Sequence, residues 1–437
     1  MLIKSFCIQN DMKTGEKIRF LLNEWYNYEL PDLVEREIEY DIVQSKKIIT
    51  FVGVRRAGKT YLQFQIIKHL LGEGIPKENI IYFNFEDERL YPLNGDELTL
   101  LLPAYFENYN PKKGTIYLFL DEIQNIPYWS KWVRRVYDKE KNIKIFITGS
   151  SAKLLSKIST TINVYPMNFR EFLKANKINF DTNKLTEKQE AIIKKYFKEY
   201  LLYGGFPEII FEKEKNQILQ EYYNSIFYHD IIERYGIKNL KLLDLLLGLL
   251  ISYSSKKISF TKLERIIKSM GYKVSKATLI EYANYAQKVF LIFLVPLFSY
   301  KIKDILLYPK KVYCIDTGLA NAMSIKFRSE LWALYENMVF VELLRRNKEV
   351  YYWKEKDAEV DFIIKRGTSI EQAIQVSYDV EDSATMKREI RGITKAMDEF
   401  NLKTGLIITK DYENTKRIKN KTIQFVPIYK WLLKPGI

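Results

Sequence analysis

Cysteine and histidine are scarce in this chain of 437 residues, which contains two of each. Cys7 and Cys314 are too few and too far apart in sequence for a disulfide framework, and only His69 and His229 offer imidazole ligands. The composition therefore predicts a reduced protein without a cysteine-based zinc site.

Long apolar runs are also absent. The longest, Leu245 to Ile251 and Val289 to Phe298, fall well short of the ~18 residues that a membrane span requires. The first ten residues contain no apolar signal region. We therefore expect a cytoplasmic protein without a membrane partner.

Apolar and aromatic side chains, by contrast, make up 47% and 14% of the residues, which is enough to bury large cores. The length allows about three domains of ordinary size. The net charge is +15, and residues 231–330, with 17 basic and 7 acidic side chains, supply +10 of it. Such a concentration is typical of a surface that binds polyphosphate, although a solvated basic face has the same composition.

A phosphate-binding loop is the most informative motif. Residues 53–60, GVRRAGKT, have the spacing G-x-x-x-x-G-K-[ST]. The apolar segment Lys47 to Val52 before the loop predicts a buried strand, and Tyr61 to Gly74 after it has helical spacing. A loop between a strand and a helix presents backbone N–H groups to phosphate at the helix N-terminus.

This motif predicts a site for ATP and Mg²⁺. Lys59 is expected to reach the β- and γ-phosphates, and Thr60 is expected to bind the metal. The predicted nucleotide-binding residues are Gly53, Val54, Arg55, Arg56, Ala57, Gly58, Lys59, Thr60 and Tyr61.

Two acids follow a second apolar segment, Thr115 to Leu120, which predicts a buried parallel strand. The carboxyl ends of such strands are where α/β sheets bind ligands. We therefore expect Asp121 to hold the magnesium shell and Glu122 to orient and deprotonate the attacking water. A further strand, Ile80 to Phe85, is predicted between the two motifs, as in ATPases that use a catalytic glutamate.

Two polar residues near the predicted γ-phosphate position have competing interpretations. Ser150, after the predicted strand Lys144 to Thr148, is expected either to sense hydrolysis or to cap the next helix. Asn84 is expected either to hydrogen-bond Glu122 and restrain it or to serve as a turn residue.

Seven motifs lie within residues 53–239: GVRRAGKT, NFED, FLDEIQNIPYW, FITGSSAKLLS, VYPMNFREFL, YLLYGGFPEII and YHDIIERYGIKN. In these motifs the chain resembles archaeal and bacterial AAA+-type ATPases of the archaeal-ATPase group. The resemblance covers nearly the whole chain. It implies a parallel five-stranded AAA+-like core of an α/β fold, its last strand being Thr161 to Pro166. An α-rich winged-helix domain and a C-terminal α/β restriction-endonuclease-like domain are implied to follow.

The resemblance sets the expected boundaries: the ATPase core with its helical lead-in spans residues 1–175, a helical lid 176–235, the winged helix 236–325 and the nuclease-like domain 326–437. Proteins of this group commonly carry an arginine just before VYP, but this chain does not. The remaining arginine-finger candidates are Arg234, which lies in a motif of the group, and Arg134 and Arg135, whose helical spacing equally predicts an exposed stripe.

Residues 236–320 have the pattern of three helices followed by two strands with a basic tip. In a winged helix, the third helix, from Ser275, would enter a groove of DNA, and the two strands would form the wing. We expect Lys273, Lys276, Lys301 and Lys303 to contact phosphates without sequence specificity, aided by Ser275, Thr278, Tyr300, Lys310 and Lys311. The alternative is that this module is a lid or docks a protein.

The C-terminal segment has the order helix, strand, strand of the nuclease-like fold, over residues 333–347, 351–367 and 371–379. Asp361 offers one acid, and Glu336 or Glu342 offers a second. Gln375 and Ser377 stand where a nuclease of this type has a carboxylate and a lysine, so we expect a fold that binds partners or DNA but does not cut.

Together these features predict an ATPase that associates with DNA and couples hydrolysis of ATP to ADP to domain movement. Two alternatives remain open: a nucleotide-gated switch that binds a protein and turns over slowly, and an ATP-regulated nuclease. The AAA+ resemblance is compatible with an oligomer.

Overall fold

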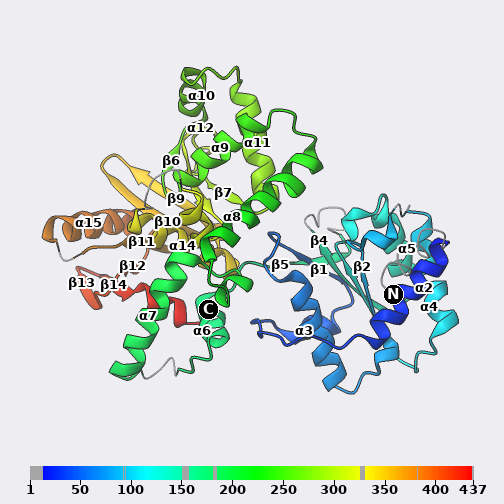
Figure 1. Ribbon diagram of the computed structural model, residues 1–437. Coiled ribbons are helices and arrows are strands. Elements are labelled where there is room, and N and C mark those ends of the chain that lie inside the picture. The colour runs from blue at the N-terminus through cyan, green and yellow to red at the C-terminus, as the bar shows by residue number, and fades with distance from the viewer. Residues whose placement is uncertain are drawn as a thin grey trace. The chain divides into compact units, whose positions relative to one another are not determined.

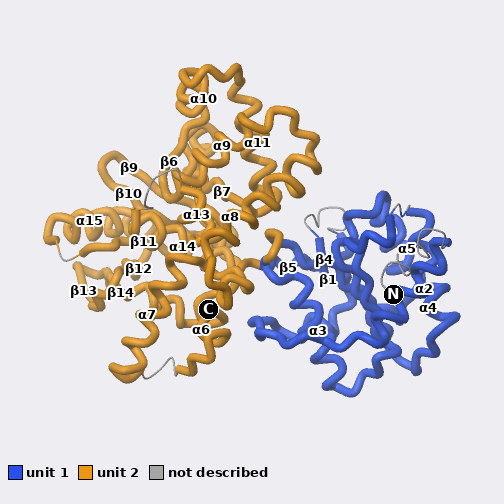
Figure 2. The backbone as a smooth tube through the Cα atoms, viewed as in Figure 1, with its two compact units in different colours: residues 1–53, 57–164 blue, residues 54–56, 165–437 orange. Residues whose placement is uncertain are grey.

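The computed structural model describes residues 13–91, 93, 95–149, 157–180, 185–324, 330–380 and 382–435. The chain divides into two compact units, drawn in two colours in Figure 2. Unit 1 comprises residues 1–53 and 57–164, and unit 2 comprises residues 54–56 and 165–437. The four-part division expected from the sequence stays a prediction.

Unit 1, drawn in blue to cyan in Figure 1, is an α/β structure. Its five-stranded parallel sheet has the order β2-β3-β4-β1-β5. This confirms the predicted core. Its strands are β1 Ile48–Val52, β2 Ile80–Asn84, β3 Ile116–Asp121, β4 Ile143–Gly149 and β5 Ser159–Asn163. Its α-helices are α2 Thr14–Asn27, α3 Lys59–Gly72, α4 Leu101–Asn108 and α5 Trp129–Lys139.

Burial explains why these segments form a sheet. All residues of β1 and β4 are buried, as expected for central strands covered on both faces. Ile18 of α2, Leu101 of α4 and Val133 of α5 join one core cluster with residues of β2, β3 and β4. The sheet order places β4 between β1 and β3, so the loop after β1 and the acids at the end of β3 lie at the same edge.

The first part of unit 2 is helical and ends in a small antiparallel sheet with the order β6-β8-β7. Its helices are α6 Phe169–Ala175, α7 Glu187–Tyr203, α8 Lys215–Ser225, the π-helix η9 Ile226–Glu233, α9 Leu240–Ser252, α10 Phe260–Ser269, α11 Lys276–Lys288, α12 Ile302–Leu307 and α13 Thr317–Ala322. Its strands are β6 Lys257–Ile258, β7 Ile292–Val295 and β8 Lys310–Cys314. The predicted three helices and two strands are present as α9, α10, α11, β7 and β8, but β6 lies between α9 and α10, and α12 takes the place of the expected tip.

The second part of unit 2 is built on a six-stranded mixed sheet with the order β13-β14-β12-β11-β10-β9. Its elements are α14 Leu331–Arg345, β9 Glu349–Glu355, β10 Ala358–Arg366, β11 Ser369–Ser377, α15 Ser383–Glu399, β12 Thr404–Thr409, β13 Asn414–Ile418, β14 Lys421–Pro427 and α16 Ile428–Leu433. Ile393, Ala396 and Met397 of α15 pack in the core of this sheet.

One predicted element of this part is wrong. The sequence indicated one strand across residues 351–367, but β9 and β10 form an antiparallel hairpin whose turn contains Lys356 and Asp357. The charged stretch KEKD interrupts the apolar residues and allows the chain to reverse. Among the described residues, no helix is both long enough and apolar enough to cross a membrane.

Candidate nucleotide site

The loop after β1 has the backbone geometry that its glycines predict. A Cβ atom on Gly53 would lie 2.0 Å from the carbonyl oxygen of Val164, so only glycine fits there. Gly58 has a φ of 92° and precedes the first residue of α3, Lys59. Glycine adopts this left-handed conformation without steric cost, and the first N–H groups of α3 follow it directly.

The Lys59 side chain is buried and faces the acids at the end of β3. Its Nζ atom lies 3.3 Å from the carbonyl oxygen of Gly53 and 3.5 Å from Oε1 of Glu122. Only 7% of its surface is exposed. A buried ammonium in this place offers a fixed positive charge for an anionic ligand.

Asp121 accepts hydrogen bonds from three hydroxyl groups. Its Oδ2 atom accepts hydrogen bonds from the hydroxyl of Thr60 at 2.7 Å and from the hydroxyl of Tyr82 at 2.8 Å, and its Oδ1 atom accepts one from Thr148. Burial raises the pKa of Asp121, and the hydroxyls of Thr148 and Thr60 partly offset this effect.

The donor set fits magnesium. The hydroxyl of Thr60 and the carboxylate of Asp121 are adjacent hard oxygen donors, which Mg²⁺ prefers. The described residues contain no group of three or more acidic, histidine or cysteine side chains that would form a protein-only metal site. Thr60 and Asp121 would therefore hold the ion together with phosphate and water, and the ion would neutralise phosphate charge.

Glu122, the residue expected to be the catalytic base, has an uncommon backbone conformation. Its φ is 50°, which is uncommon for a residue with a side chain and is often found at functional sites. Its backbone N–H donates to the hydroxyl of Thr148 at 2.8 Å, and Gln124 donates to its carboxylate. Thr148 therefore connects the backbone of Glu122 with the carboxylate of Asp121.

Asn84 ends β2 and lies next to Asp121 in the β2–β3 register. Its side chain, however, accepts a hydrogen bond from the backbone of Glu86 at 2.9 Å, which is the turn role. Gln124, which the sequence did not single out, donates an amide hydrogen bond to the Glu122 carboxylate. Ser150 lies outside the described residues, so its role as a sensor stays a prediction.

The arginines of the loop have acidic partners within unit 2. Arg55 Nε lies 3.2 Å from Asp230 Oδ2, and Arg56 lies 3.4 Å from Glu208. The guanidinium of Arg56 also lies 5.8 Å from the ring centre of Tyr222. The last predicted contact, Tyr61, is 51% exposed on α3. Nucleotide contacts by these residues and by Val54 and Ala57 stay predictions.

The three arginine-finger candidates are exposed. Arg134 lies 3.9 Å from Asp138 on α5, and the buried Trp129 and Trp132 of that helix face the core. Arg134 and Arg135 therefore lie on the exposed side of α5, as the exposed-stripe interpretation predicts. The guanidinium of Arg234 lies 5.6 Å from the ring centre of Tyr235, and its role as a finger stays a prediction.

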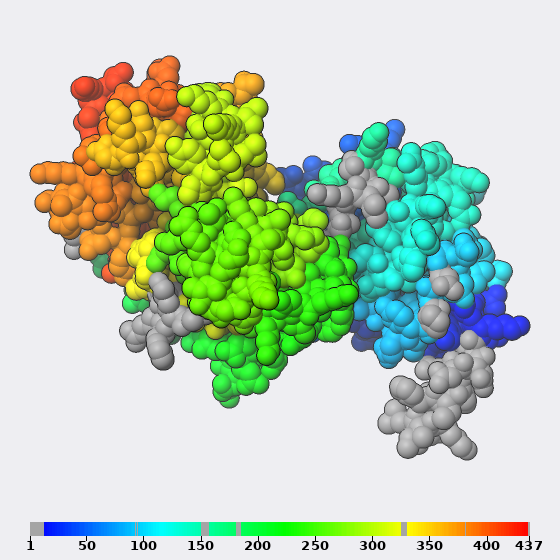
Figure 3. All heavy atoms as spheres, turned by 90° about the horizontal axis from the view of Figure 1, so that it is seen from above, coloured from blue at the N-terminus to red at the C-terminus, as the bar shows by residue number. Residues whose placement is uncertain are grey.

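The basic segment presents its predicted phosphate contacts to solvent. Lys273, Lys276, Lys301 and Lys303 are exposed. Figure 3 shows the surface of this green to yellow-green part of the chain from above. Ser275 caps α11 by accepting from the backbone of Thr278 at 3.1 Å.

Lys311 does not lie at this surface, although the sequence suggested a phosphate contact. Only 3% of the residue is exposed, and its Nζ atom lies 2.7 Å from Asp361 Oδ1 and 3.0 Å from Glu336 Oε1. A third carboxylate, that of Glu359, lies 3.6 Å away. The sequence contained no local signal for this cluster because its members come from β8, α14 and β10.

Of the two candidates for a second acid, Glu336 and Glu342, it is Glu336 that shares this cluster with Asp361. Glu336 shares Lys311 with it, while the backbone N–H of Asp361 donates to Gln375 Oε1 at 3.1 Å. The pKa of Glu336 is raised to about 7, first by burial and then by the charge of Asp361, and Lys311 lowers it. The hydroxyl of Ser377 donates a hydrogen bond to the backbone carbonyl oxygen of Asp379.

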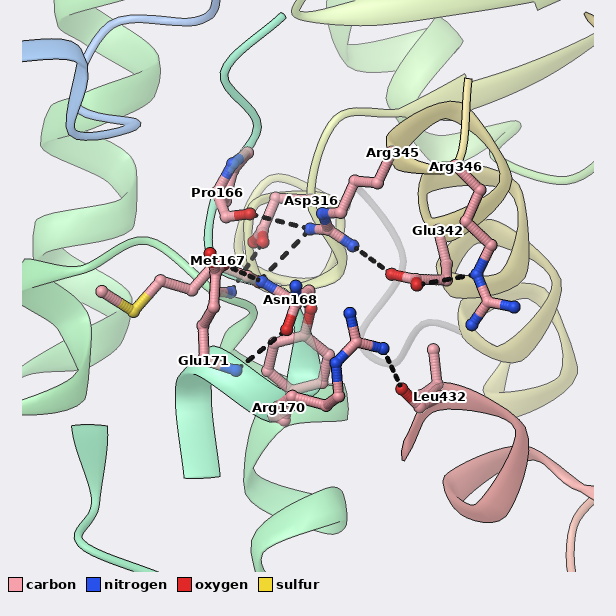
Figure 4. Close-up of polar contacts among 12 residues, drawn as sticks. Pro166, Met167, Asn168, Arg170, Glu171, Asp316, Glu342, Arg345, Arg346 and Leu432 are labelled. Atoms are coloured by element: carbon pink, nitrogen blue, oxygen red, sulfur yellow. Dashed lines mark hydrogen bonds and ion pairs between the residues drawn. The ribbon is translucent and has the colours of Figure 1, made fainter. Parts of the chain in front are cut away.

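Glu342 belongs to a different network, which Figure 4 shows. It pairs with Arg345 at 3.3 Å and with Arg346 at 3.0 Å. Arg345 also donates to the backbone carbonyl oxygens of Pro166 and Met167, so the network connects α14 with the segment before α6. Glu342 therefore has a structural role within unit 2.

The fold and the site define an AAA-type P-loop ATPase, an architecture that supports ATP binding and hydrolysis. Comparison with known proteins agrees. An AAA domain family, AAA_14, matches residues 45–173. Two families described as domains of unknown function, DUF8612 and DUF4143, match residues 194–330 and 333–431.

Relatives match along most of the chain. Uncharacterized protein MJ1544 of Methanocaldococcus jannaschii is 40% identical over 427 residues, which cover 92% of this chain and 91% of that protein. An uncharacterized protein of Haemophilus influenzae is 29% identical over 412 residues, covering 92% and 97%. The chain therefore belongs to the same family as MJ1544, a family of AAA+-type ATPases.

Among solved structures, the Walker-type ATPase of Pyrococcus abyssi matches with a TM-score of 0.40 and 13% identity, covering 72% of this chain and 96% of that one. A signal transduction ATPase of Pyrococcus horikoshii with a tetratricopeptide repeat sensor matches with a TM-score of 0.29 and 15% identity, covering 74% and 47%. Because both scores are low, our assignment of the fold rests on the sheet order and the loop geometry.

Proposed function

We propose that the protein hydrolyses ATP with Mg²⁺ and associates with DNA through the basic segment, residues 231–330. The observation that carries the first part is the pairing of Lys59 with Glu122 and of Thr60 with Asp121 at the loop after β1. Lys59 binds the β- and γ-phosphates, Glu122 accepts a proton from the attacking water, and the loop positions the nucleotide.

The DNA part is supported by the exposure of four lysines in the segment that carries +10. Phosphate contacts from such side chains give non-specific binding that weakens with salt. We further propose that ATP hydrolysis is coupled to movement of this segment. The Lys311 ammonium already pairs with Glu336 and Asp361, which favours a binding role for the C-terminal sheet over metal-dependent cleavage.

A nucleotide-gated switch that binds a protein is the second candidate, and one observation favours it. Between β7 and β8, the side chains of Tyr300, Ile302, Leu306, Leu307 and Tyr308 are 50–76% exposed. Apolar side chains gathered on a surface in this way often mark a protein contact. Stimulation of ATP hydrolysis by DNA would support the first function, and its absence together with ATP-dependent binding of a protein would support the second.

Salt dependence tests the DNA interface. The variant in which Lys273, Lys276, Lys301 and Lys303 are all replaced by Ala should bind duplex DNA more weakly. The slope of log affinity against log salt should become shallower by up to about 3 to 4, because each phosphate contact contributes roughly −0.9. Fluorescence anisotropy at several salt concentrations measures both quantities.

A matched variant separates this interface from net charge. Replacing Lys46, Lys68, Lys113 and Lys139, which are exposed in unit 1, removes the same charge and should leave the slope nearly unchanged. Equal losses in the two variants would show that the basic segment is not the binding surface.

A further inference from the structure

We infer that Tyr82 is a positioning residue for the magnesium carboxylate Asp121, an inference that rests on the proposed ATPase function. Tyr82 lies on β2, two residues before Asn84, which pairs in register with Asp121. Alternate residues of a strand share a face, so the Tyr82 side chain can extend along the sheet to the end of β3. Its hydroxyl donates to Asp121 Oδ2 at 2.8 Å.

The Tyr82 ring is fixed by two aromatic neighbours from different helices. Its centre lies 5.1 Å from that of Trp25 on α2 and 5.0 Å from that of Phe64 on α3. Trp25 is itself attached to β2 because its Nε1 atom donates to the carbonyl oxygen of Ile80 at 2.9 Å. The lead-in helix and the helix of the phosphate loop therefore both determine where the hydroxyl points.

The role of Tyr82 follows from the three hydroxyls on Asp121. Thr60 would bind Mg²⁺ through a lone pair of its hydroxyl oxygen, and its hydrogen could still be donated to Oδ2. Tyr82 donates to the same Oδ2 atom from a different strand, β2, while Thr148 orients Oδ1. Partners of this kind hold a metal-binding carboxylate in place and raise the affinity of the site for the metal.

The test compares Tyr82→Phe with the unmodified protein in titrations of a fluorescent ATP analogue at increasing Mg²⁺. We expect Tyr82→Phe to require about tenfold more Mg²⁺ for half-maximal tightening of nucleotide binding. Nucleotide affinity in EDTA should be unchanged, since Tyr82 is not a phosphate contact. The kcat at limiting Mg²⁺ should fall and recover at high Mg²⁺.

Tyr105→Phe is the matched control, because Tyr105 also donates a hydrogen bond in unit 1, to the carbonyl oxygen of Glu78 in the 3-10 helix Lys77–Asn79 before β2. It should alter thermal stability without altering the Mg²⁺ requirement. An unchanged Mg²⁺ requirement in Tyr82→Phe would overturn the inference while leaving the ATPase proposal intact. Failure of the unmodified protein to bind nucleotide would instead overturn the proposed function, and the inference with it.

Discussion

Replacing Lys59 with Ala is expected to lower the affinity for ATP by at least about 100-fold, since two charge-assisted phosphate contacts are lost. The reason is the position of its buried Nζ atom, 3.3 Å from the Gly53 carbonyl and 3.5 Å from Glu122. Without the ammonium, the γ-phosphate would face Glu122 with no protein cation between them. Isothermal titration with a non-hydrolysable ATP analogue measures the loss.

Lys68→Ala is the matched control for this experiment. Lys68 lies on the same helix, α3, but its side chain is exposed, so its removal should leave nucleotide affinity unchanged. Thermal unfolding without nucleotide checks that both variants fold. If Lys59→Ala binds ATP as tightly as the unmodified protein, residues 53–60 do not form the nucleotide site.

Replacing Lys311 with Met is expected to destabilise unit 2 by about 3–5 kcal/mol near pH 8, the usual cost of removing one partner of a buried ion pair. Methionine fills similar volume but leaves Glu336 and Asp361 buried without their shared cation. Scanning calorimetry of the unfolding transition measures the effect.

The pH dependence shows whether charge is the cause. The pKa of Glu336 in the folded protein, about 7, is raised above its ordinary value of 4.5, so its contribution to stability is present below pH 4.5 and is lost as pH rises through 7. Lys311 limits this loss, because it lowers the pKa of Glu336. The penalty of Lys311→Met should therefore be small at pH 5 and grow towards pH 8.

Two further variants sharpen the Lys311 experiment. Adding Glu336→Gln to Lys311→Met should restore part of the stability at pH 8, because it removes one unpaired charge. Lys310→Met changes the preceding, partly exposed residue and should have little effect. An equal penalty at pH 5 and pH 8 would indicate that packing, not charge, is what Lys311 provides.

Local sequence patterns were sufficient to predict the core of the ATPase. The loop at residues 53–60 and the acids Asp121 and Glu122 follow strands whose apolar character is continuous, so their placement at one sheet edge follows from the fold class. The same apolar segments predicted the five-stranded sheet, which the structure confirms. Periodicity also predicted the order of α9, α10, α11, β7 and β8 in the basic segment.

Contacts made by tertiary packing could not be predicted in this way. The hydrogen bond from Tyr82 to Asp121 depends on the β2–β3 register, and the Lys311 cluster joins residues 25 and 50 positions apart. Lys311 looked like a wing lysine because its local composition is basic. The turn at Lys356 was missed because apolar residues flank it on both sides.

The central claim is that Glu122 activates water at a site where Lys59 binds ATP and Thr60 and Asp121 hold magnesium. The most direct measurement is single-turnover hydrolysis of radiolabelled ATP by Glu122→Gln, with nucleotide binding measured on the same sample. The claim predicts ATP affinity close to that of the unmodified protein and hydrolysis slower by about 100-fold or more, since the general base is lost. Hydrolysis at the unmodified rate would contradict it.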